Sequence, residues 1–536
     1  MKKEKFLVHA VILAVAGFVS RALGLLYAIP LYHIIGEEGN GYYGTAYEIY
    51  NMLLLITAYS MPVAISKIMS VYVAEKDYVN CRRLLRTCLF YVILVGGAGG
   101  VVTYIFADSL VIEPAALSLK VMAPTIFFSG LLSVFRGYTQ AHNTMVPTAL
   151  SQIVEQLFNA IFSIALALAL VKYATTQSDT ELPPPAYGAM GSSLGTLIGV
   201  LTALTFMIIY IMSTKKTRAK LYQQVTPVNS VDSRNAPKKP EPYFTLFRVI
   251  FMYASPIIIT SFLYNLCTTL DMKIFWNWAM ENGYSQETAA SIFGIYSRQY
   301  LVLINLPIAI ASAVSSSMMP GLSVSFSCHE IEDVKARISK AVRSVVLIAV
   351  PAVVGLMVLA KPIMQTLFKG TSDAASDALT LGSVSVLFFS VATVLNCGLQ
   401  AMGKSFIAIK NVTKALIIHV LYVIGMLNVS GSVMGILVSG SILYSMVMCF
   451  SNIQSLEKYF GCRFKVISVI GKPVMASGLM GVVTVSSMSI LTGVGLGNLL
   501  SLVITIAISI AVYFAIFYFK NDYVDKGIFL NMQRVN

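Results

Sequence analysis

Long apolar runs separated by short polar segments repeat along nearly the whole chain. A helix that crosses a bilayer needs about 20 predominantly apolar residues, and such helices tolerate internal Gly and Pro. About fourteen runs of this kind can be traced. The pattern predicts an all-α integral membrane protein with about fourteen transmembrane helices. The expected limits are 7–34, 44–74, 84–107, 118–141, 148–172, 187–213, 247–274, 290–318, 340–360, 376–402, 406–428, 432–456, 466–492 and 496–519.

The least apolar stretch, 214–242, separates two sets of six runs and leaves two runs at the end. It contains a basic cluster and several prolines, which are typical of a linker. Two short matches relate the two sets: Met61-Pro62-Val63-Ala64-Ile65 with Leu306-Pro307-Ile308-Ala309-Ile310, and Gln140-Ala141 with Gln400-Ala401. Such a parallel repeat is typical of transporters that bind their cargo between two halves. We expect an N-terminal six-helix lobe at 1–213, a cytoplasmic linker at 214–242, a C-terminal six-helix lobe at 243–459, and two extra helices with a cytoplasmic tail at 460–536.

Composition strengthens the membrane interpretation. The chain has 536 residues, of which 57% are hydrophobic and 12% are charged, whereas an ordinary soluble domain has about 25% charged residues. This excludes a nucleic-acid enzyme, a secreted hydrolase and a disordered scaffold. The seven cysteines are scattered singly, so neither a disulfide framework nor a zinc site is indicated. We therefore expect no metal and no cofactor.

The formal net charge of +14 does not indicate nucleic-acid binding, because the basic residues can be sorted by the side of the membrane they face. If every run spans the membrane, most Lys and Arg lie on one side, and the opposite loops are mainly acidic. The positive-inside rule then places both termini in the cytoplasm.

Charged residues within the apolar runs are the strongest functional signal. Burying one at the bilayer centre costs about 2.5–3.5 kcal/mol, so each needs a partner or a wet cavity. Arg21 lies near the middle of the first run, where the alternative is a structural ion pair. Glu48 and Lys67 lie toward the ends of the second run, Asp271 near the outer end of the seventh, and Arg298 in the outer third of the eighth. For Glu48 and Asp271, reaching the headgroup layer is an equal alternative.

Other polar positions are open to a structural interpretation. Gln152, Glu155, Gln156 and Asn159 form a polar stripe on one face of the fifth helix. Hydrogen bonding between helices explains it as well as a cavity lining does. His419 stands alone, and a packing histidine is the favoured interpretation. The cations Arg21, Lys67 and Arg298 are at least as prominent as the acids, which suits an anionic cargo, because Arg pairs bidentately with phosphate or carboxylate.

Three stretches resemble a known family. Ser20-Arg21-Ala22-Leu23-Gly24 resembles a pattern of the lipid II flippases in the multidrug/oligosaccharidyl-lipid/polysaccharide (MOP) exporter superfamily. Arg136-Gly137-Tyr138-Thr139-Gln140, with Met145-Val146-Pro147-Thr148-Ala149 and Ser151-Gln152-Ile153-Val154-Glu155-Gln156, is similar to its stage V sporulation protein B branch. Ile304-Asn305-Leu306-Pro307-Ile308-Ala309, followed by Met319-Pro320, is similar to the eighth span of that branch. The resemblance covers essentially the whole chain.

The resemblance implies a non-enzymatic flippase of the bacterial cytoplasmic membrane. Its two lobes would alternate between inward-open and outward-open forms and move an undecaprenyl-diphosphate-linked saccharide outward, most closely lipid II. The partners would be this lipid, the membrane lipids, and Na⁺, H⁺ or the membrane potential as the coupling agent. Tyr27 and Tyr42 replace an Arg and an acid of the fuller pattern, which favours the sporulation-protein branch. The expected substrate-binding residues are Arg21, Lys67, Arg298, Arg136, Gln152 and Glu155, and the expected ion-coupling residues are Glu48 and Asp271.

Three alternatives remain open at this point. The cargo could be another polysaccharide lipid precursor, for teichoic acid, capsule or spore wall. A cation-coupled multidrug antiporter of the same superfamily is a second alternative, although twelve spans and a more acidic cavity would be expected there. A non-transporting membrane scaffold is the third.

Overall fold

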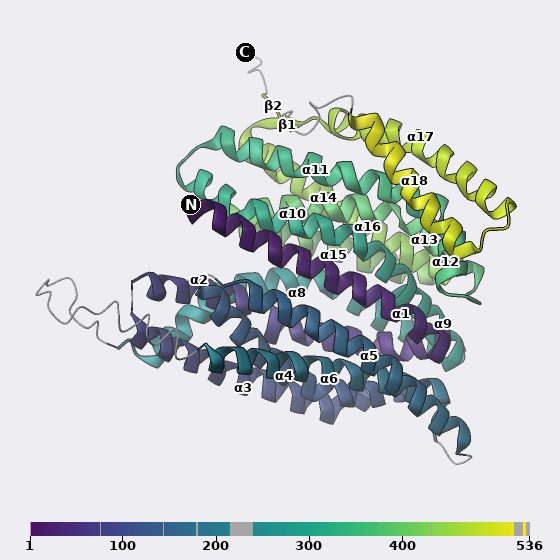
Figure 1. Cartoon of the computed structure of the whole chain (residues 1–536), viewed down its shortest axis with the longest axis horizontal. Coiled ribbons are helices and arrows are strands. Elements are labelled where there is room, and N and C mark those ends of the chain that lie inside the picture. Colours follow the sequence, from purple (N-terminus) through teal and green to yellow (C-terminus); the bar gives the residue numbers. More distant parts are fainter. Residues whose placement is uncertain are drawn as a thin grey trace, which may run out of the picture. The chain divides into compact units, whose positions relative to one another are not determined.

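The computed structural model describes residues 2–59, 61–75, 77–142, 144–177, 181–214, 240–429, 431–518 and 529–531. These residues are almost entirely helical (Figure 1). Helices satisfy every backbone hydrogen bond within the segment, which a bilayer interior requires. Twelve helices in the described ranges are long and apolar enough to cross a membrane. The protein is therefore an all-α integral membrane protein, as the sequence predicts. The predicted linker at 214–242 lies almost wholly outside the described residues.

The number of spans depends on two long helices. Helix α1 (Lys2–Leu54) has 53 residues and would be about 80 Å long if straight, which is enough for two crossings. Its backbone is non-helical at Gly36 (φ 69°, ψ −171°), a combination that is accessible essentially only to glycine. Helix α8 (Tyr243–Glu281) has 39 residues, and its first part, Tyr243–Met252, is apolar. The predicted count of fourteen spans stays a prediction.

The chain divides into two compact units. The N-terminal unit comprises Met1–Tyr27 and Thr45–Phe262, and the C-terminal unit comprises Ala28–Gly44 and Leu263–Asn536. The predicted lobes follow chain order, whereas residues 28–44 of α1 pack with the C-terminal unit.

The N-terminal unit packs its helices closely through small residues. Helix α6 presents Gly195 and Gly199 to α5, where an added Cβ would lie 2.3 Å from the Ser163 nitrogen and 2.6 Å from the Glu155 carbonyl oxygen, respectively. Small residues let membrane helices approach this closely. Besides the ends of α1 and the start of α8, the unit contains π-helix η1 (Leu55–Tyr59), α2 (Met61–Ala74), α3 (Tyr78–Leu110), α4 (Glu113–Ala141), α5 (Val146–Thr176) and α6 (Pro184–Ser213).

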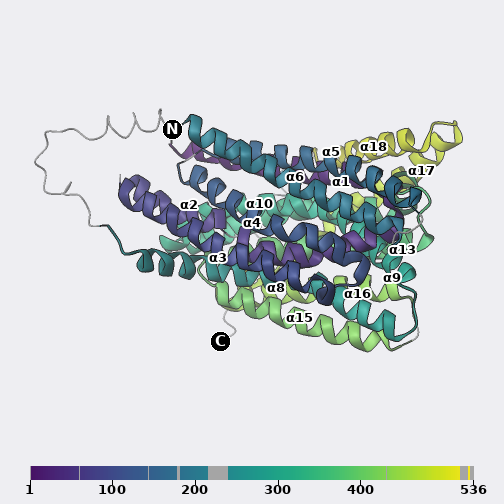
Figure 2. The same cartoon turned by 90° about the horizontal axis from the view of Figure 1, so that it is seen from below.

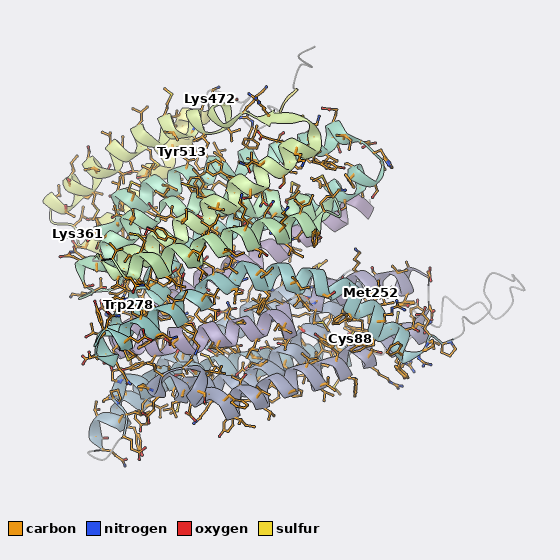
Figure 3. All side chains as sticks on the ribbon, turned by 180° about the vertical axis from the view of Figure 1, so that it is seen from behind. Cys88, Met252, Trp278, Lys361, Lys472 and Tyr513 are labelled. Carbon is orange, nitrogen blue, oxygen red and sulfur yellow. The ribbon has the colours of Figure 1, made fainter. Side chains whose placement is uncertain are left out.

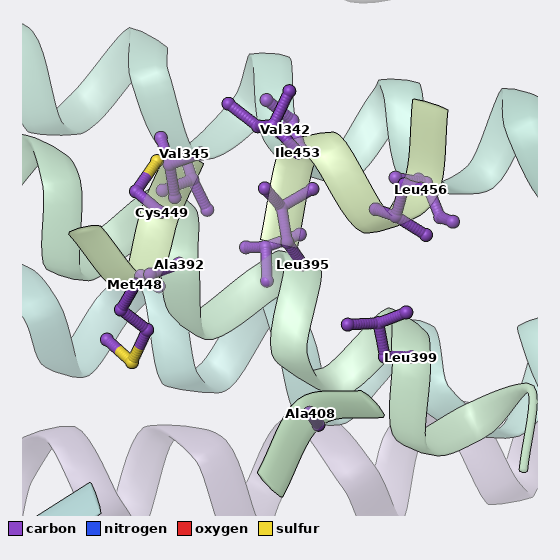
Figure 4. Packing of buried hydrophobic residues seen from close by; sticks show 14 of the residues in the cluster. Val342, Val345, Ala392, Leu395, Leu399, Ala408, Met448, Cys449, Ile453 and Leu456 are labelled. Atoms are coloured by element: carbon purple, nitrogen blue, oxygen red, sulfur yellow. The ribbon is translucent and has the colours of Figure 1, made fainter. Parts of the chain in front are cut away.

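The C-terminal unit is built around a large apolar core (Figure 4). Val342 from α11, Leu395 from α14 and Leu456 from α16 are fully buried in it. Helices α15 and α16 lie side by side (Figure 2). The elements are α9 (Gln286–Gly294), π-helix η3 (Ile295–Tyr300), α10 (Leu301–Ser327), α11 (Ile331–Val358), α12 (Ala360–Leu367), α13 (Asp373–Gly382), α14 (Val384–Ala401), α15 (Ser405–Leu427), α16 (Val433–Phe460), β1 (Cys462–Phe464), α17 (Val466–Gly493), α18 (Asn498–Tyr518) and β2 (Phe529–Asn531).

The last two helices form a pair that packs on α11 (Figures 1 and 3). Tyr513 of α18 is buried beside α17 residues, and Thr484 and Ser509 join the two helices by a 2.7 Å hydrogen bond. Arg343 of α11 is only 1% exposed and donates a 3.0 Å hydrogen bond to the Ser468 carbonyl at the start of α17. The outer surface of this pair is strongly apolar, as lipid contact requires. Strands β1 and β2 pair antiparallel.

Both units contain a π-helix directly before a helix that carries proline. Segment η1 precedes α2 with Pro62, and η3 precedes α10 with Pro307. The proline-containing segments, 61–65 and 306–310, are the two that sequence matching pairs. π-helical turns are rare overall but occur often at functional sites. Tyr59 and Arg298, which lie on the two π-helices, are therefore candidate functional residues.

Candidate functional site

In the N-terminal unit, Arg136 of α4 is held by two residues one turn apart on α5. Its Nη2 atom lies 2.7 Å from Glu155 Oε2, and its Nε donates to Ser151 Oγ at 2.9 Å. The Arg136 and Glu155 side chains are 15% and 22% exposed, respectively. The pair is therefore largely buried, and its charges neutralise each other.

Arg21 adds a third charge to this neighbourhood. It lies on an exposed position of α1 in the same unit. The Tyr59 hydroxyl is within electrostatic range of Arg21, Arg136 and Glu155. Tyr59 ends η1 and is itself exposed. We call Arg21, Tyr59, Arg136 and Glu155 the N-terminal cluster. Two of its four residues carry a guanidinium group and one carries a carboxylate.

The predicted polar stripe on α5 divides into two parts. Asn159 is buried and its Oδ1 accepts hydrogen bonds from Ser163 (2.8 Å) and from Thr196 of α6 (3.3 Å). It therefore joins α5 to α6, as the structural alternative supposes. Glu155 belongs to the N-terminal cluster, and the Gln152 Oε1 atom is buried without a hydrogen-bond partner among the described residues. The other two predicted residues of this unit are Lys67, exposed on α2, and Glu48, partly buried on α1.

In the C-terminal unit, Arg298 lies on η3 and contacts residues 28–44. Its guanidinium carbon is 4.5 Å from the centre of the Tyr43 ring, a cation–π contact. The neighbouring Ser297 packs so closely on Gly44 that a Cβ there would lie 2.3 Å from the Ser297 Oγ. Glu37 of the same segment accepts hydrogen bonds from Thr371 Oγ1 (2.7 Å) and the Ser372 backbone nitrogen (3.1 Å).

Asp271 and His419 form a fully buried pair in this unit. His419 Nε2 lies 2.6 Å from Asp271 Oδ1, and both residues are 0% exposed. The Tyr296 hydroxyl of η3 donates to Asp271 Oδ2 at 2.8 Å, and His419 Nδ1 lies 2.8 Å from the Gly440 carbonyl oxygen of α16. The suggestion that Asp271 reaches the headgroup layer is wrong, because the residue is wholly enclosed.

His419 packs in the interior, as predicted, but its hydrogen bond to a carboxylate was missed. The two residues are 148 positions apart, and each looks isolated in the sequence. Only a weak signal was available: Asp271 and His419 are both ionisable residues within apolar runs.

A third potential ligand lies beside this pair. Cys267, Asp271 and His419 bring a sulfur, a carboxylate oxygen and an imidazole nitrogen within 4.8 Å of one another. The sequence, in which the cysteines are scattered singly, did not predict this group of three. Two ligands of one tetrahedral zinc ion lie about 3.3 Å apart, given bonds of about 2.0–2.1 Å. The His419–Asp271 separation of 2.6 Å is shorter than that and is a hydrogen-bond distance. The arrangement is therefore that of a hydrogen-bonded pair.

Two solved structures share the fold of this chain. A lipid II flippase MurJ in the inward closed conformation is 16% identical, with a TM-score of 0.64 over 96% of this chain and 100% of the other. An inward-facing multidrug resistance MATE family transporter of the MOP superfamily is 14% identical, with a TM-score of 0.63 over 84% of this chain and 98% of the other. At these identities the likeness shows the fold alone.

Sequence relatives extend along nearly the whole chain. It is 22% identical to the lipid II flippase MurJ of Bacillus subtilis (strain 168) over 486 residues, which cover 87% of this chain and 85% of the relative. It is 25% identical to stage V sporulation protein B of the same organism over 493 residues, 88% of this chain and 89% of the relative. The family described as "Polysaccharide biosynthesis protein" matches residues 7–326. Because that match spans more than half of the sequence, the chain belongs to the polysaccharide biosynthesis protein family.

Proposed function

We propose that this protein is a flippase for lipid-linked saccharides. It would move an undecaprenyl-diphosphate-linked saccharide from the inner to the outer leaflet by alternating access, with lipid II as the first candidate. Family membership and the long match to a lipid II flippase support this proposal. We further propose that the protein lies in the bacterial cytoplasmic membrane with both termini in the cytoplasm, because of the distribution of its basic residues.

The N-terminal cluster is the observation that carries the proposal. It places two guanidinium groups and one carboxylate on helices whose neighbouring positions are apolar. Glu155 pairs with Arg136, and Arg21 brings a second guanidinium group to the same unit. A guanidinium group can bind a diphosphate bidentately, and the exposed Tyr59 hydroxyl of the same unit would add a neutral donor. An exposed cation on a membrane helix is suited to bind an anionic headgroup and to release it.

The remaining predicted residues have secondary roles in this proposal. Lys67 and Arg298 would add positive charge along the headgroup path, and Gln152 would contribute an amide beside Glu155. The packing of Arg298 on Tyr43 fixes the orientation of its guanidinium group. Glu48 stays a candidate for ion coupling.

The test is rescue of a bacterial strain depleted of its lipid II flippases. Arg21→Ala should abolish growth, whereas Arg86→Ala should rescue as well as the unchanged protein does. Arg86 is a suitable control because it is an exposed arginine on α3 outside the cluster. A charged hydrogen bond contributes about 1.5–3 kcal/mol, so flipping by Arg21→Ala should fall about 10- to 100-fold. Full rescue by Arg21→Ala at equal protein level would remove the cluster from the mechanism.

The identity of the cargo needs a second measurement. Labelled lipid II should disappear from the outer leaflet when this protein is depleted from cells that have no other lipid II flippase. If lipid II exposure stays constant, the cargo is a different lipid precursor, such as one for teichoic acid, capsule or spore wall.

A further inference from the structure

We propose that Asp271 and His419 form a proton-binding site, and that the proton bound there is the ion coupled to transport. The coupling part of this inference rests on the proposed flippase function, whereas the proton-binding part stands on the geometry of the pair. The amino-acid sequence does not choose between Na⁺ and H⁺ as the coupled cation. The hydrogen bonds of the pair distinguish between these two cations.

The two hydrogen bonds of His419 determine where its imidazole protons lie. A backbone carbonyl oxygen can only accept a hydrogen bond, so His419 Nδ1 must donate to Gly440. In a neutral ring Nε2 then carries a lone pair. It faces Asp271 Oδ1 at 2.6 Å, and an ionised carboxylate also presents only lone pairs. Two acceptors at this distance repel, so one further proton must lie between them, bonded either to Asp271 or to His419.

The burial of Asp271 and His419 determines which net charge the pair can carry. With the shared proton the pair has no net charge, and without it the pair carries one negative charge. Both residues are fully enclosed, and an uncompensated charge is very unfavourable in such surroundings. The closed arrangement therefore holds one proton, and its release requires a conformation that admits water or another cation. Protonation and conformation are thus linked, as a coupled transporter requires.

The groups facing the pair come from every element packed around it. Cys267 lies one turn before Asp271 on α8, Tyr296 and Tyr300 come from η3, and the Tyr444 ring of α16 lies 5.8 Å from the His419 ring. These groups are a thiol and three phenols. Lys273 is two residues beyond Asp271 and half-buried, so its side chain starts from a different face of α8.

The same geometry disfavours sodium. Hard cations prefer carboxylate, carbonyl and water oxygens, whereas imidazole suits transition metals. Here an imidazole nitrogen occupies the contact to Oδ1, and the Tyr296 hydroxyl occupies the contact to Oδ2. A proton fits the 2.6 Å separation without any movement.

Tyr296 connects the pair to a proposed substrate residue. It lies on η3 together with Arg298, two residues further along. Loss of the shared proton changes the charge that Asp271 presents to the Tyr296 hydroxyl, and therefore the hydrogen bond that holds η3. The π-helical segment can transmit this change to Arg298 within the C-terminal unit.

Proton binding can be tested without transport. Infrared difference spectra of the full chain in detergent, recorded between about pH 4 and pH 10, should show a carboxyl or imidazole signal from the pair. Asp271→Asn should remove the signal, because an amide N–H can replace the shared proton while keeping the hydrogen bond to His419. Asp377→Asn is the matched control, since Asp377 is an exposed carboxylate in the same unit. An unchanged signal in Asp271→Asn, or one produced by Na⁺ at constant pH, would overturn the proton site.

Coupling is tested in vesicles that contain the full chain and fluorescent lipid II. A pH difference of about 2 units provides a driving factor of about 100 for one proton. Imposing it should accelerate flipping by the unchanged protein and by Asp377→Asn, but not by Asp271→Asn, and Tyr296→Phe should weaken the response. Flipping that ignores the pH difference overturns the coupling and leaves the flippase proposal standing. Absence of flipping under every gradient overturns both the flippase proposal and the coupling, while the infrared signal still decides proton binding.

Discussion

The N-terminal cluster and the Asp271–His419 pair of the C-terminal unit differ in their exposure. In the N-terminal cluster, Arg21 and Tyr59 are exposed, and Arg136 and Glu155 are partly accessible. In the C-terminal unit, Asp271 and His419 are completely enclosed, and each uses both of its polar side-chain atoms in hydrogen bonds. A partly accessible cluster with two guanidinium groups suits a large anion that must enter and leave. An enclosed pair at hydrogen-bond distance suits a proton, because a proton needs no coordination cavity.

Removing one partner of the enclosed pair should have the largest effect. Asp271→Ala leaves His419 Nε2 without its partner in a fully buried site, and breaking a buried pair costs about 3–5 kcal/mol. The free energy of unfolding in detergent should fall by that amount, whereas Asp377→Ala should change it by less than about 0.5 kcal/mol. Equal stability of the two variants would show that the pair is not enclosed.

Packing between α5 and α6 should be the next most sensitive feature. Gly195→Val places a branched side chain where even a Cβ would lie 2.3 Å from the Ser163 nitrogen. Overpacking typically costs about 1–3 kcal/mol. Gly478→Val on α17 is the control, because no heavy atom lies within 4 Å of a Cβ there. A thermal melt that distinguishes the two variants supports the close helix contact.

The Arg136–Glu155 ion pair, which is less completely buried than Asp271–His419, should show a smaller effect. Arg136→Ala and Glu155→Ala should each cost about 1–2 kcal/mol, and the double variant should cost less than their sum, because the two charges compensate each other. Unfolding measured across this double-mutant cycle gives the coupling energy. Strict additivity would mean that the 2.7 Å contact contributes no energy.

An exposed ion pair should give the smallest change in the free energy of unfolding. Lys361 and Asp373 are 3.7 Å apart, with side chains 64% and 82% exposed, respectively. Exposed pairs contribute about 0–1 kcal/mol and are screened by salt. Lys361→Ala should shift unfolding by less than about 0.5 kcal/mol, and a larger loss would show that exposure does not govern these energies.

The sequence predicted the helical membrane fold because apolar runs and helix formation are both local properties. Runs such as 148–172 and 187–213 lie within α5 and α6. It did not predict that α1 continues past the end of the first run, since a single glycine conformation decides where that helix bends. The π-helical turns at η1 and η3 were equally inaccessible, because they depend on packing and not on apolar periodicity.

The candidate site was predictable in its residues but not in its pairings. Arg21 was selected because charges are costly in apolar runs, Glu155 because it lies on a polar stripe, and Arg136 because its stretch resembles a known family. The structure joins Arg136 and Glu155 in an ion pair. The Asp271–His419 pair joins residues 148 positions apart, and periodicity carries no information about such contacts. The cost of burying a charge in an apolar run marks a candidate residue, whereas its partner is set by tertiary structure.

The course of α1 has a consequence for dividing this protein into halves. A cut within 214–242 appears natural, but the N-terminal fragment would retain residues 28–44, which pack with the C-terminal unit. The remaining fragment would then lack Glu37 and expose the Thr371 and Ser372 groups that bind it. Independent expression of the C-terminal half therefore requires the Ala28–Gly44 segment to be supplied in trans or fused to it.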